Sequence, residues 1–145
     1  STTYYDYLKA FAVDNVLGGS SWNTALHNGF FKKELNLPIV EEFVSNVVIS
    51  DHQSNDEGEL ISLIQDFGMR YDGIVFNPGG FSHTSVAIRD AVSSVSARVI
   101  EVHISNIHAR EEFRRITIVG GACEAVISGF GVRGYEIAVE HLIKL

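Results

Sequence analysis

The chain has 145 residues, of which 46% are hydrophobic and 20% are charged, a composition typical of one globular domain with a sizeable core. Its net charge of −7 argues against a nucleic-acid partner, and no apolar run approaches the roughly 18 residues that cross a bilayer, so no membrane partner is expected. Cys123 is the only cysteine, which excludes a disulfide framework and a Cys-based zinc site and predicts a cytoplasmic protein.

The arginines are confined to the second half of the chain, because none precedes Arg70. In so acidic a protein, a small anionic substrate would need a local cationic site. Any arginine that binds such a substrate is therefore expected from residue 70 onward.

An ambiguous N-terminal third precedes a regular alternation of strands and helices. The ambiguous part is compatible with a strand at 9–13, a loop or weak helix at 18–30 that serves as a lid or as plain surface, and a helix at 38–46. Short β-branched segments then predict strands at 47–53, 73–76, 97–103 and 124–129. Amphipathic patterns predict helices at 58–69, 85–95 and 135–145. This alternation predicts a single α/β domain over residues 1–145 with a parallel sheet.

Polar side chains gather where two of the predicted strands end. Asn77 and His83 follow the strand at 73–76, and the strand at 97–103 contains Glu101, ends at His103 and leads to Ser105. In open parallel sheets, ligands bind beyond the carboxyl ends of the strands. Glu101 and His103 are two residues apart and so share one face of the strand. A carboxylate beside an imidazole orients the ring and favours its protonated form, as a general acid requires.

Each of these residues also has a purely structural explanation. A histidine at a strand end is more often structural than catalytic, Asn77 before Pro78 is a common turn former, and His108 and Arg110 are compatible with a solvated loop. Together they support a hypothesis rather than an assignment: an α/β enzyme or binding domain for a small polar, anionic molecule.

Four long segments between residues 47 and 145 have distinctive sequences. They are QSNDEGELI (53–61), NPGGFSHTSVAIRDA (77–91), EVHISNIHAREEFR (101–114) and ISGFGVRGY (127–135). In order and spacing, residues 47–145 resemble the type II dehydroquinases. The resemblance implies a flavodoxin-like three-layer sandwich with a five-stranded parallel sheet. It implies a hydro-lyase of the shikimate pathway or of quinate breakdown, which converts 3-dehydroquinate to 3-dehydroshikimate by anti elimination through an enolate. It also implies no metal or organic cofactor, and a homo-oligomer of trimers assembled into a dodecamer.

For the chemical step, the resemblance assigns roles to two neighbouring segments. His103 resembles the general acid that protonates the departing C1 hydroxyl, with Glu101 as the carboxylate that orients it. The backbone N–H groups of Ile104 and Ser105 resemble the clamp on the substrate carboxylate. Adjacent main-chain donors are physically suited to this role, because they bind an anion without a buried cation.

Four further residues resemble the family's substrate contacts. Asn77 resembles a contact to a substrate hydroxyl, His83 the substrate-binding histidine, and Arg114 the arginine that binds ring hydroxyls. Asp90 resembles an acid that reaches the site of a neighbouring subunit across the trimer interface, although a salt bridge on an exposed helix explains it equally well.

The N-terminal third departs from the family pattern. The family's lid carries an essential arginine and the tyrosine that acts as the base, yet no Tyr lies between Tyr7 and Tyr71 and no Arg precedes Arg70. Residues 9–19 are compatible with an altered lid region, with Asn15 near the family's asparagine turn. Other candidates for the base are Tyr4, Tyr5 and Tyr7, with Lys32 or Lys33 supplying charge, and His27.

Two functions stay open at this point. The first is an active dehydratase with a divergent lid, favoured by the retained acid and substrate contacts. The second is a catalytically silent relative that binds a cyclic polyol carboxylate or acts as an assembly module, favoured by the missing lid residues. Ile116-Thr117-Ile118 also stands where the family has a His-Ser-Tyr run, which puts the assembly state in doubt.

Overall fold

The computed structural model describes residues 8–14 and 48–143. Its strands are β1 (Leu8–Asp14), β2 (Val48–Ser54), β3 (Gly73–Asn77), β4 (Arg98–His103) and β5 (Ala125–Ser128). Its helices are α5 (Glu57–Arg70), α6 (Val86–Ser94) and α7 (Arg133–Ile143), and its short 3-10 helices are η2 (Gly79–His83), η3 (Ile107–Ala109), η4 (Glu112–Arg114) and η5 (Val119–Ala122). The strand predicted at 9–13 and the elements predicted from residue 47 onward are confirmed, with ends shifted by a few residues. The segments 18–30 and 38–46 lie outside the described residues.

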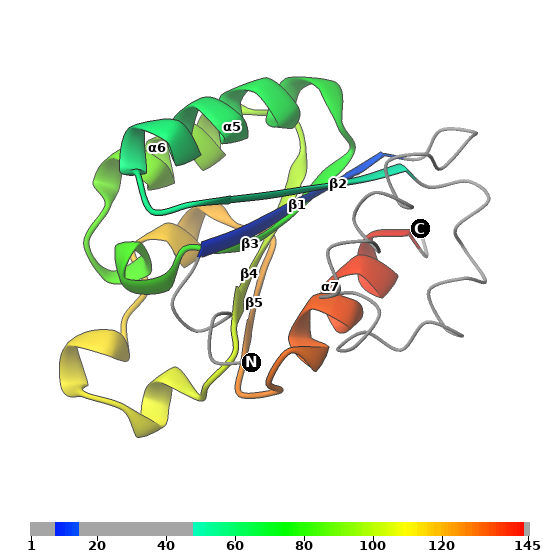
Figure 1. The fold of residues 1–145 in the computed structure, drawn as a ribbon. Coiled ribbons are helices and arrows are strands. Elements are labelled where there is room, and N and C mark those ends of the chain that lie inside the picture. The colour runs from blue at the N-terminus through cyan, green and yellow to red at the C-terminus, as the bar shows by residue number, and fades with distance from the viewer. Residues whose placement is uncertain (1–7, 15–47, 144–145) are drawn as a thin grey trace.

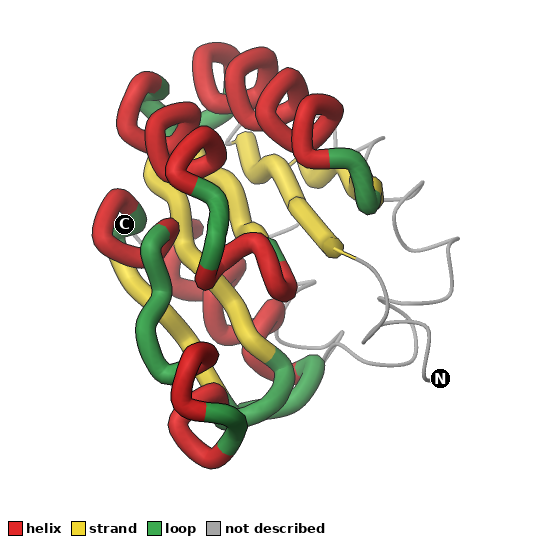
Figure 2. Tube along the Cα trace, turned by 90° about the vertical axis from the view of Figure 1, so that its left-hand side faces the viewer, coloured by secondary structure: helices red, strands yellow, loops and turns green. Residues whose placement is uncertain are grey.

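The elements form a layered α/β structure. Helices α5 and α6 cover one face of the sheet and α7 covers the other (Figure 1). The view turned by 90° shows helical segments on both sides of the strands (Figure 2). In the part of the chain that the structure describes, no helix is long and apolar enough to span a membrane.

The strands lie in the order β2-β1-β3-β4-β5. Strand β4 pairs in parallel with both β3 and β5, which confirms the predicted α/β architecture with parallel strands. Strand β1, however, pairs antiparallel with both β2 and β3, so the prediction that all the strands run parallel is wrong for β1. The physical reason is that the apolar pattern of residues 9–13 specifies an extended strand but not its direction. Parallel and antiparallel ladders both satisfy the backbone hydrogen bonds of such a strand.

Capping side chains fix the starts of α5 and α6. Asp56 accepts a hydrogen bond from the Gly58 N–H at 2.9 Å, and Ser85 accepts one from the Ile88 N–H at 2.9 Å. The Ser85 hydroxyl also donates to the Glu57 carboxylate, which ties the first turn of α5 to the start of α6. The beginning of α6, and with it the chain that leads from η2, is thereby held in place.

The core lies between these two helices and the strands beneath them. Helix α5 contributes Leu60 and Ile64, helix α6 contributes Ile88 and Val92, and the strands contribute Ile74, Phe76 and Val99. Burial of each of these large side chains contributes about 1.5–3 kcal/mol. Gly68 allows α5 to lie close to the C-terminal end of α6, because a Cβ atom at this position would lie 2.5 Å from the Val95 side chain. This packed layer supports the ends of β3 and β4, where polar side chains collect.

Candidate active site

A cavity of about 240 Å³ opens beyond the carboxyl ends of β3 and β4. This is the edge of the sheet at which parallel α/β folds bind ligands. Six residues with predicted roles line it together: Asn77, His83, His103, Ile104, Ser105 and Arg114. The cavity is completed by Gly79, Gly80, Ile107 and Arg110. The structure therefore brings residues from two strand ends and two loops around one small space.

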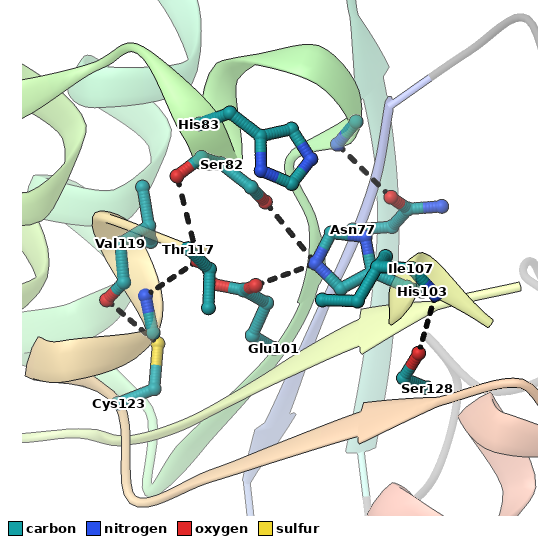
Figure 3. Close-up of polar contacts among 12 residues, drawn as sticks. Asn77, Ser82, His83, Glu101, His103, Ile107, Thr117, Val119, Cys123 and Ser128 are labelled. Carbon is teal, nitrogen blue, oxygen red and sulfur yellow. Dashed lines mark hydrogen bonds and ion pairs between the residues drawn. The ribbon is translucent and has the colours of Figure 1, made fainter. Parts of the chain in front are cut away.

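The buried pair His103 and Glu101 lies at the wall of this cavity. His103 Nε2 is 2.5 Å from Glu101 Oε2, and the exposed fractions of the two side chains are 7% and 0% (Figure 3). An ionised carboxylate only accepts hydrogen bonds, so Nε2 carries the proton that this contact uses. Nδ1 has no partner among the described residues, which leaves it as the ring nitrogen available to a ligand. Doubly protonated His103 can thus donate from Nδ1 while Glu101 stabilises its positive charge.

Ser82 and Thr117 complete the surroundings of this pair. The Ser82 hydroxyl lies 3.2 Å from His103 Nε2, and the Thr117 hydroxyl donates to Glu101 Oε1 at 2.9 Å. Figure 3 shows Ser82 and Thr117 beside the Glu101–His103 pair; Ser82 belongs to η2, and Thr117 lies between η4 and η5. Sequence reasoning missed both residues. Ser82 stood next to a predicted site residue, and Thr117 lay in a segment noted only for its departure from the family pattern.

His83 lies beside His103, with ring centroids 5.9 Å apart and planes inclined by 27°. Its Nδ1 is 2.7 Å from the carbonyl oxygen of Ile116. A carbonyl oxygen accepts hydrogen bonds and never donates them, so Nδ1 carries a proton. In the neutral ring, Nε2 is then an acceptor, which suits a ligand hydroxyl.

Asn77 is held in one orientation by two hydrogen bonds. Its Nδ2 donates to the Tyr135 hydroxyl at 2.9 Å, and its Oδ1 accepts from the Gly79 N–H at 3.0 Å. The contact with Gly79 assigns the amide nitrogen and oxygen, because a backbone N–H only donates and its partner must therefore be the amide oxygen. Tyr135 is fully buried on α7, and sequence reasoning did not identify it. Its contact joins the helix on one face of the sheet to the cavity at the sheet edge.

The backbone after β4 brings the N–H groups of two adjacent residues to the cavity. The Ile104 carbonyl accepts from the Gly131 N–H at 2.9 Å, and the Ser105 carbonyl accepts from the Ser128 hydroxyl at 3.2 Å. Gly131 has φ +61°, a conformation that favours glycine, which allows the chain after β5 to reach this loop. Within the described residues, the N–H groups of Ile104 and Ser105 donate to no acceptor, and both residues line the cavity. Two adjacent N–H groups of this kind can bind an anion.

Two arginines bring positive charge to the cavity. Arg114 Nε lies 3.1 Å from Glu111 Oε1 and its side chain is 24% exposed, while Arg110 Nε lies 3.7 Å from the same oxygen. The pKa of Glu111 is lowered, first by a hydrogen bond from its own backbone and then by the charges of Arg114 and Arg110. Arg110, which the sequence alone left in a solvated loop, lines the cavity as well.

The remaining predicted site residues lie elsewhere. Asp90 is exposed on α6 and does not line the cavity, and Asn15 lies outside the described residues. Burial raises the pKa of the Cys123 thiol to about 12, with the charge of Glu101 adding to the effect. Among residues 8–14 and 48–143, no group of three or more His, Cys, Asp or Glu side chains is arranged to hold a metal ion.

Comparisons with known proteins all lead to the same family. A family model described as dehydroquinase class II matches residues 33–143. A relative from Bacillus pumilus, named 3-dehydroquinate dehydratase, is 46% identical over 100 residues, which cover 69% of this chain and 68% of the relative. A relative of the same name from Fusobacterium nucleatum is 50% identical over 100 residues, which cover 68% of each chain. The solved type II dehydroquinase from Butyrivibrio crossotus aligns with TM-score 0.60 and 49% identity, over 61% of this chain and 63% of that one. The chain thus spans about two thirds of the length of the proteins it matches.

Proposed function

Since this chain belongs to the type II dehydroquinase family, we propose that it dehydrates 3-dehydroquinate to 3-dehydroshikimate by anti elimination through an enolate. The observation that carries the proposal is the buried His103–Glu101 pair at the wall of a cavity that is also lined by two backbone N–H donors with no acceptor among the described residues. An elimination of water needs an acid for the departing hydroxyl, and a protonated imidazole held by a carboxylate meets this need.

In this proposal, His103 acts as the general acid and Glu101 keeps its ring in place. Proton transfer comes from Nδ1, because Nε2 is engaged by the Glu101 carboxylate at 2.5 Å. As the C1 hydroxyl departs, it takes the Nδ1 proton and leaves as water. The neutral imidazole that results still donates from Nε2 to Glu101, so the ring need not turn during the reaction.

The other cavity residues bind and orient the substrate. The N–H groups of Ile104 and Ser105 bind the substrate carboxylate, and the lack of an acceptor for them within residues 8–14 and 48–143 supports this role. Asn77, His83 Nε2 and Arg114 bind hydroxyl groups around the ring. Asn77 and His83 are each fixed by hydrogen bonds to the protein, so little conformational entropy is lost when the substrate binds.

We propose that the base that removes the proton next to the ketone comes from the N-terminal part of the chain. The candidates are Tyr4, Tyr5, Tyr7 and His27, all outside the described residues. Residues 1–145 are proposed to form a single dehydroquinase-like domain of the flavodoxin-like type. The strand order β2-β1-β3-β4-β5 supports this proposal, since it is the order of flavodoxin-like folds.

We further propose a homo-oligomer of trimers assembled into a dodecamer, in which Asp90 reaches the site of a neighbouring subunit. Its exposed position on α6 leaves Asp90 accessible to another copy of the chain. Large apolar side chains are also exposed near the cavity, with exposed fractions of 64% for Phe113 and 74% for Ile116, and such surfaces favour association. The cytoplasmic location stays a prediction from the sequence.

A direct assay tests the proposed activity. The purified protein is mixed with 3-dehydroquinate, and formation of the conjugated enone is followed by its ultraviolet absorbance. We expect the absorbance to rise at a rate proportional to protein concentration. Calorimetry with the same ligand serves as the control for binding. Binding without any rise in absorbance would contradict the proposal and would instead indicate a catalytically silent relative.

A further inference from the structure

One of the two oxygens of the Glu101 carboxylate accepts its hydrogen bond from the hydroxyl group of Thr117. Its side chain is fully buried, and its two oxygens have separate partners. Oε2 contacts His103 Nε2, and Oε1 accepts from the Thr117 hydroxyl at 2.9 Å. A buried carboxylate that loses a hydrogen-bond donor incurs a large desolvation cost. Thr117 is therefore important to the state of Glu101 even though it does not line the cavity.

The direction of the Thr117 hydroxyl is fixed by its surroundings. The Gly120 N–H donates to Oγ1 at 2.9 Å, so the hydroxyl proton must point to another acceptor. Among the described residues, the two acceptors within reach are Glu101 Oε1 at 2.9 Å and the Ser82 carbonyl at 3.4 Å. The Ser82 carbonyl already accepts from the Ile118 N–H at 2.7 Å. The shorter distance and the negative charge both direct the proton to Glu101.

We propose that Thr117 is a positioning residue for the general acid and acts on it through Glu101, an inference that rests on the proposed function. Its hydroxyl anchors Oε1, so that Oε2 is presented to His103 Nε2. His103 in turn directs Nδ1 to the cavity. Thr117 thus joins the loop after η4 to the acid–carboxylate pair at the end of β4, without touching the substrate.

Two substitutions of Thr117 distinguish the effect of its hydroxyl group from the effect of its shape. Thr117→Val keeps the volume and removes the donor, and Thr117→Ser keeps the donor and removes a methyl group. We expect kcat of Thr117→Val to fall roughly 10- to 100-fold, the effect of one hydrogen bond to a charged group. KM should stay within about 2-fold of wild type, because substrate contacts are untouched. Thr117→Ser should recover most of the lost kcat.

A double-mutant cycle with Glu101→Gln tests whether the effect passes through Glu101. If Thr117 acts on the carboxylate, Thr117→Val should reduce kcat little further once Glu101→Gln is present. Thr117→Val also deprives the Gly120 N–H of its acceptor, and this structural effect would persist in both backgrounds. The cycle therefore distinguishes positioning of the acid from a general loosening of the loop.

A spectroscopic measurement on the free protein is independent of turnover. The short contact between His103 Nε2 and Glu101 should give a far-downfield proton signal in the NMR spectrum, assigned by its loss in His103→Ala. We expect this signal to move upfield or vanish in Thr117→Val and to persist in Thr117→Ser. If wild-type protein lacks dehydratase activity, the proposed function fails while this measurement still tests the positioning role.

The inference is overturned by any of three results in folded protein. One is a wild-type kcat and an unchanged downfield signal in Thr117→Val. Another is equal impairment of Thr117→Val and Thr117→Ser, which would assign the effect to packing. The third is a loss of kcat on Thr117→Val that is as large in the Glu101→Gln background as in the wild type.

Discussion

A histidine–glutamate pair lies near each end of β4. His103 and Glu101 belong to the strand itself, at its carboxyl end, whereas His141 of α7 and Glu124, which precedes β5, contact Arg98 at its amino end. At the carboxyl end, the His103 and Glu101 side chains are 7% and 0% exposed. At the amino end, His141 Nε2 lies 2.8 Å from Glu124 Oε2, and the side chains are 51% and 34% exposed. The first pair faces a cavity, whereas the second lies at the protein surface.

The partners of the two glutamates explain the difference. Glu124 also pairs with Arg98, and the pKa of Glu124 is lowered to about 2 by hydrogen bonds from Arg98 first and His141 second. Glu101 has no arginine or lysine partner among the described residues, and its second oxygen is held by the neutral hydroxyl of Thr117. A surface cluster of this kind contributes little beyond local stability. A buried carboxylate with one imidazole partner can instead stabilise a charge that develops on that imidazole.

The largest expected effect comes from removing His103, with removal of His141 as the matched control. His103→Ala should lower kcat by roughly 10²–10⁴-fold, the usual contribution of a general acid, while binding of 3-dehydroquinate stays largely intact. His141→Ala should leave kcat unchanged. Steady-state kinetics and calorimetry on both variants check this contrast. Unchanged turnover in His103→Ala would remove this residue from its assigned role and with it the distinction between the two pairs.

A smaller effect is expected from the arginines at the two ends. Arg114→Ala should weaken substrate binding by about 1.5–3 kcal/mol, or roughly 10- to 150-fold in Kd, if Arg114 holds ring hydroxyls through a charge-assisted hydrogen bond. Arg98→Ala is the matched control, because it removes the same charge from the surface cluster and should leave Kd unchanged. Calorimetric titration measures both values. Equal Kd values for Arg114→Ala and wild type would show that the cationic cavity wall does not bind the substrate.

The smallest expected effect is the pH dependence of the surface cluster. The pKa of Glu124 is depressed in the folded protein from 4.5 to about 2, so its contribution to stability is present above about pH 4.5 and is lost as the pH falls toward 2. Because the side chains are partly exposed and screened by solvent, this contribution should stay below about 1 kcal/mol.

Urea unfolding of wild type and Glu124→Gln measures this contribution. The difference in free energy of unfolding should be greatest near neutral pH and should shrink as the pH is lowered from about 5 to about 2. High salt at neutral pH should reduce it as well. A difference that is constant over this range would mean that the pKa of Glu124 is the same in the folded and unfolded protein, which would contradict stabilisation of its ionised form by Arg98 and His141.

Much of the site follows from the sequence because its residues are close together along the chain. Glu101 and His103 are two residues apart on a strand, so the period of the strand places them on one face whatever the rest of the fold. Ile104 and Ser105 follow directly and bring their N–H groups to the same edge. The main helices and strands from residue 47 onward were likewise predictable to within a few residues at their ends, since each rests on a local apolar pattern.

The contacts that hold these residues were decided by tertiary structure. Tyr135 reaches Asn77 across a separation of 58 residues, Ser82 reaches His103 across 21, and Thr117 reaches Glu101 across 16. The direction of β1 in the sheet belongs to the same class of property. A local pattern specifies that a segment is extended or helical and which of its faces is apolar. Which distant hydroxyl meets a buried carboxylate depends on how the loops pack on one another, and no single segment of the sequence contains that information.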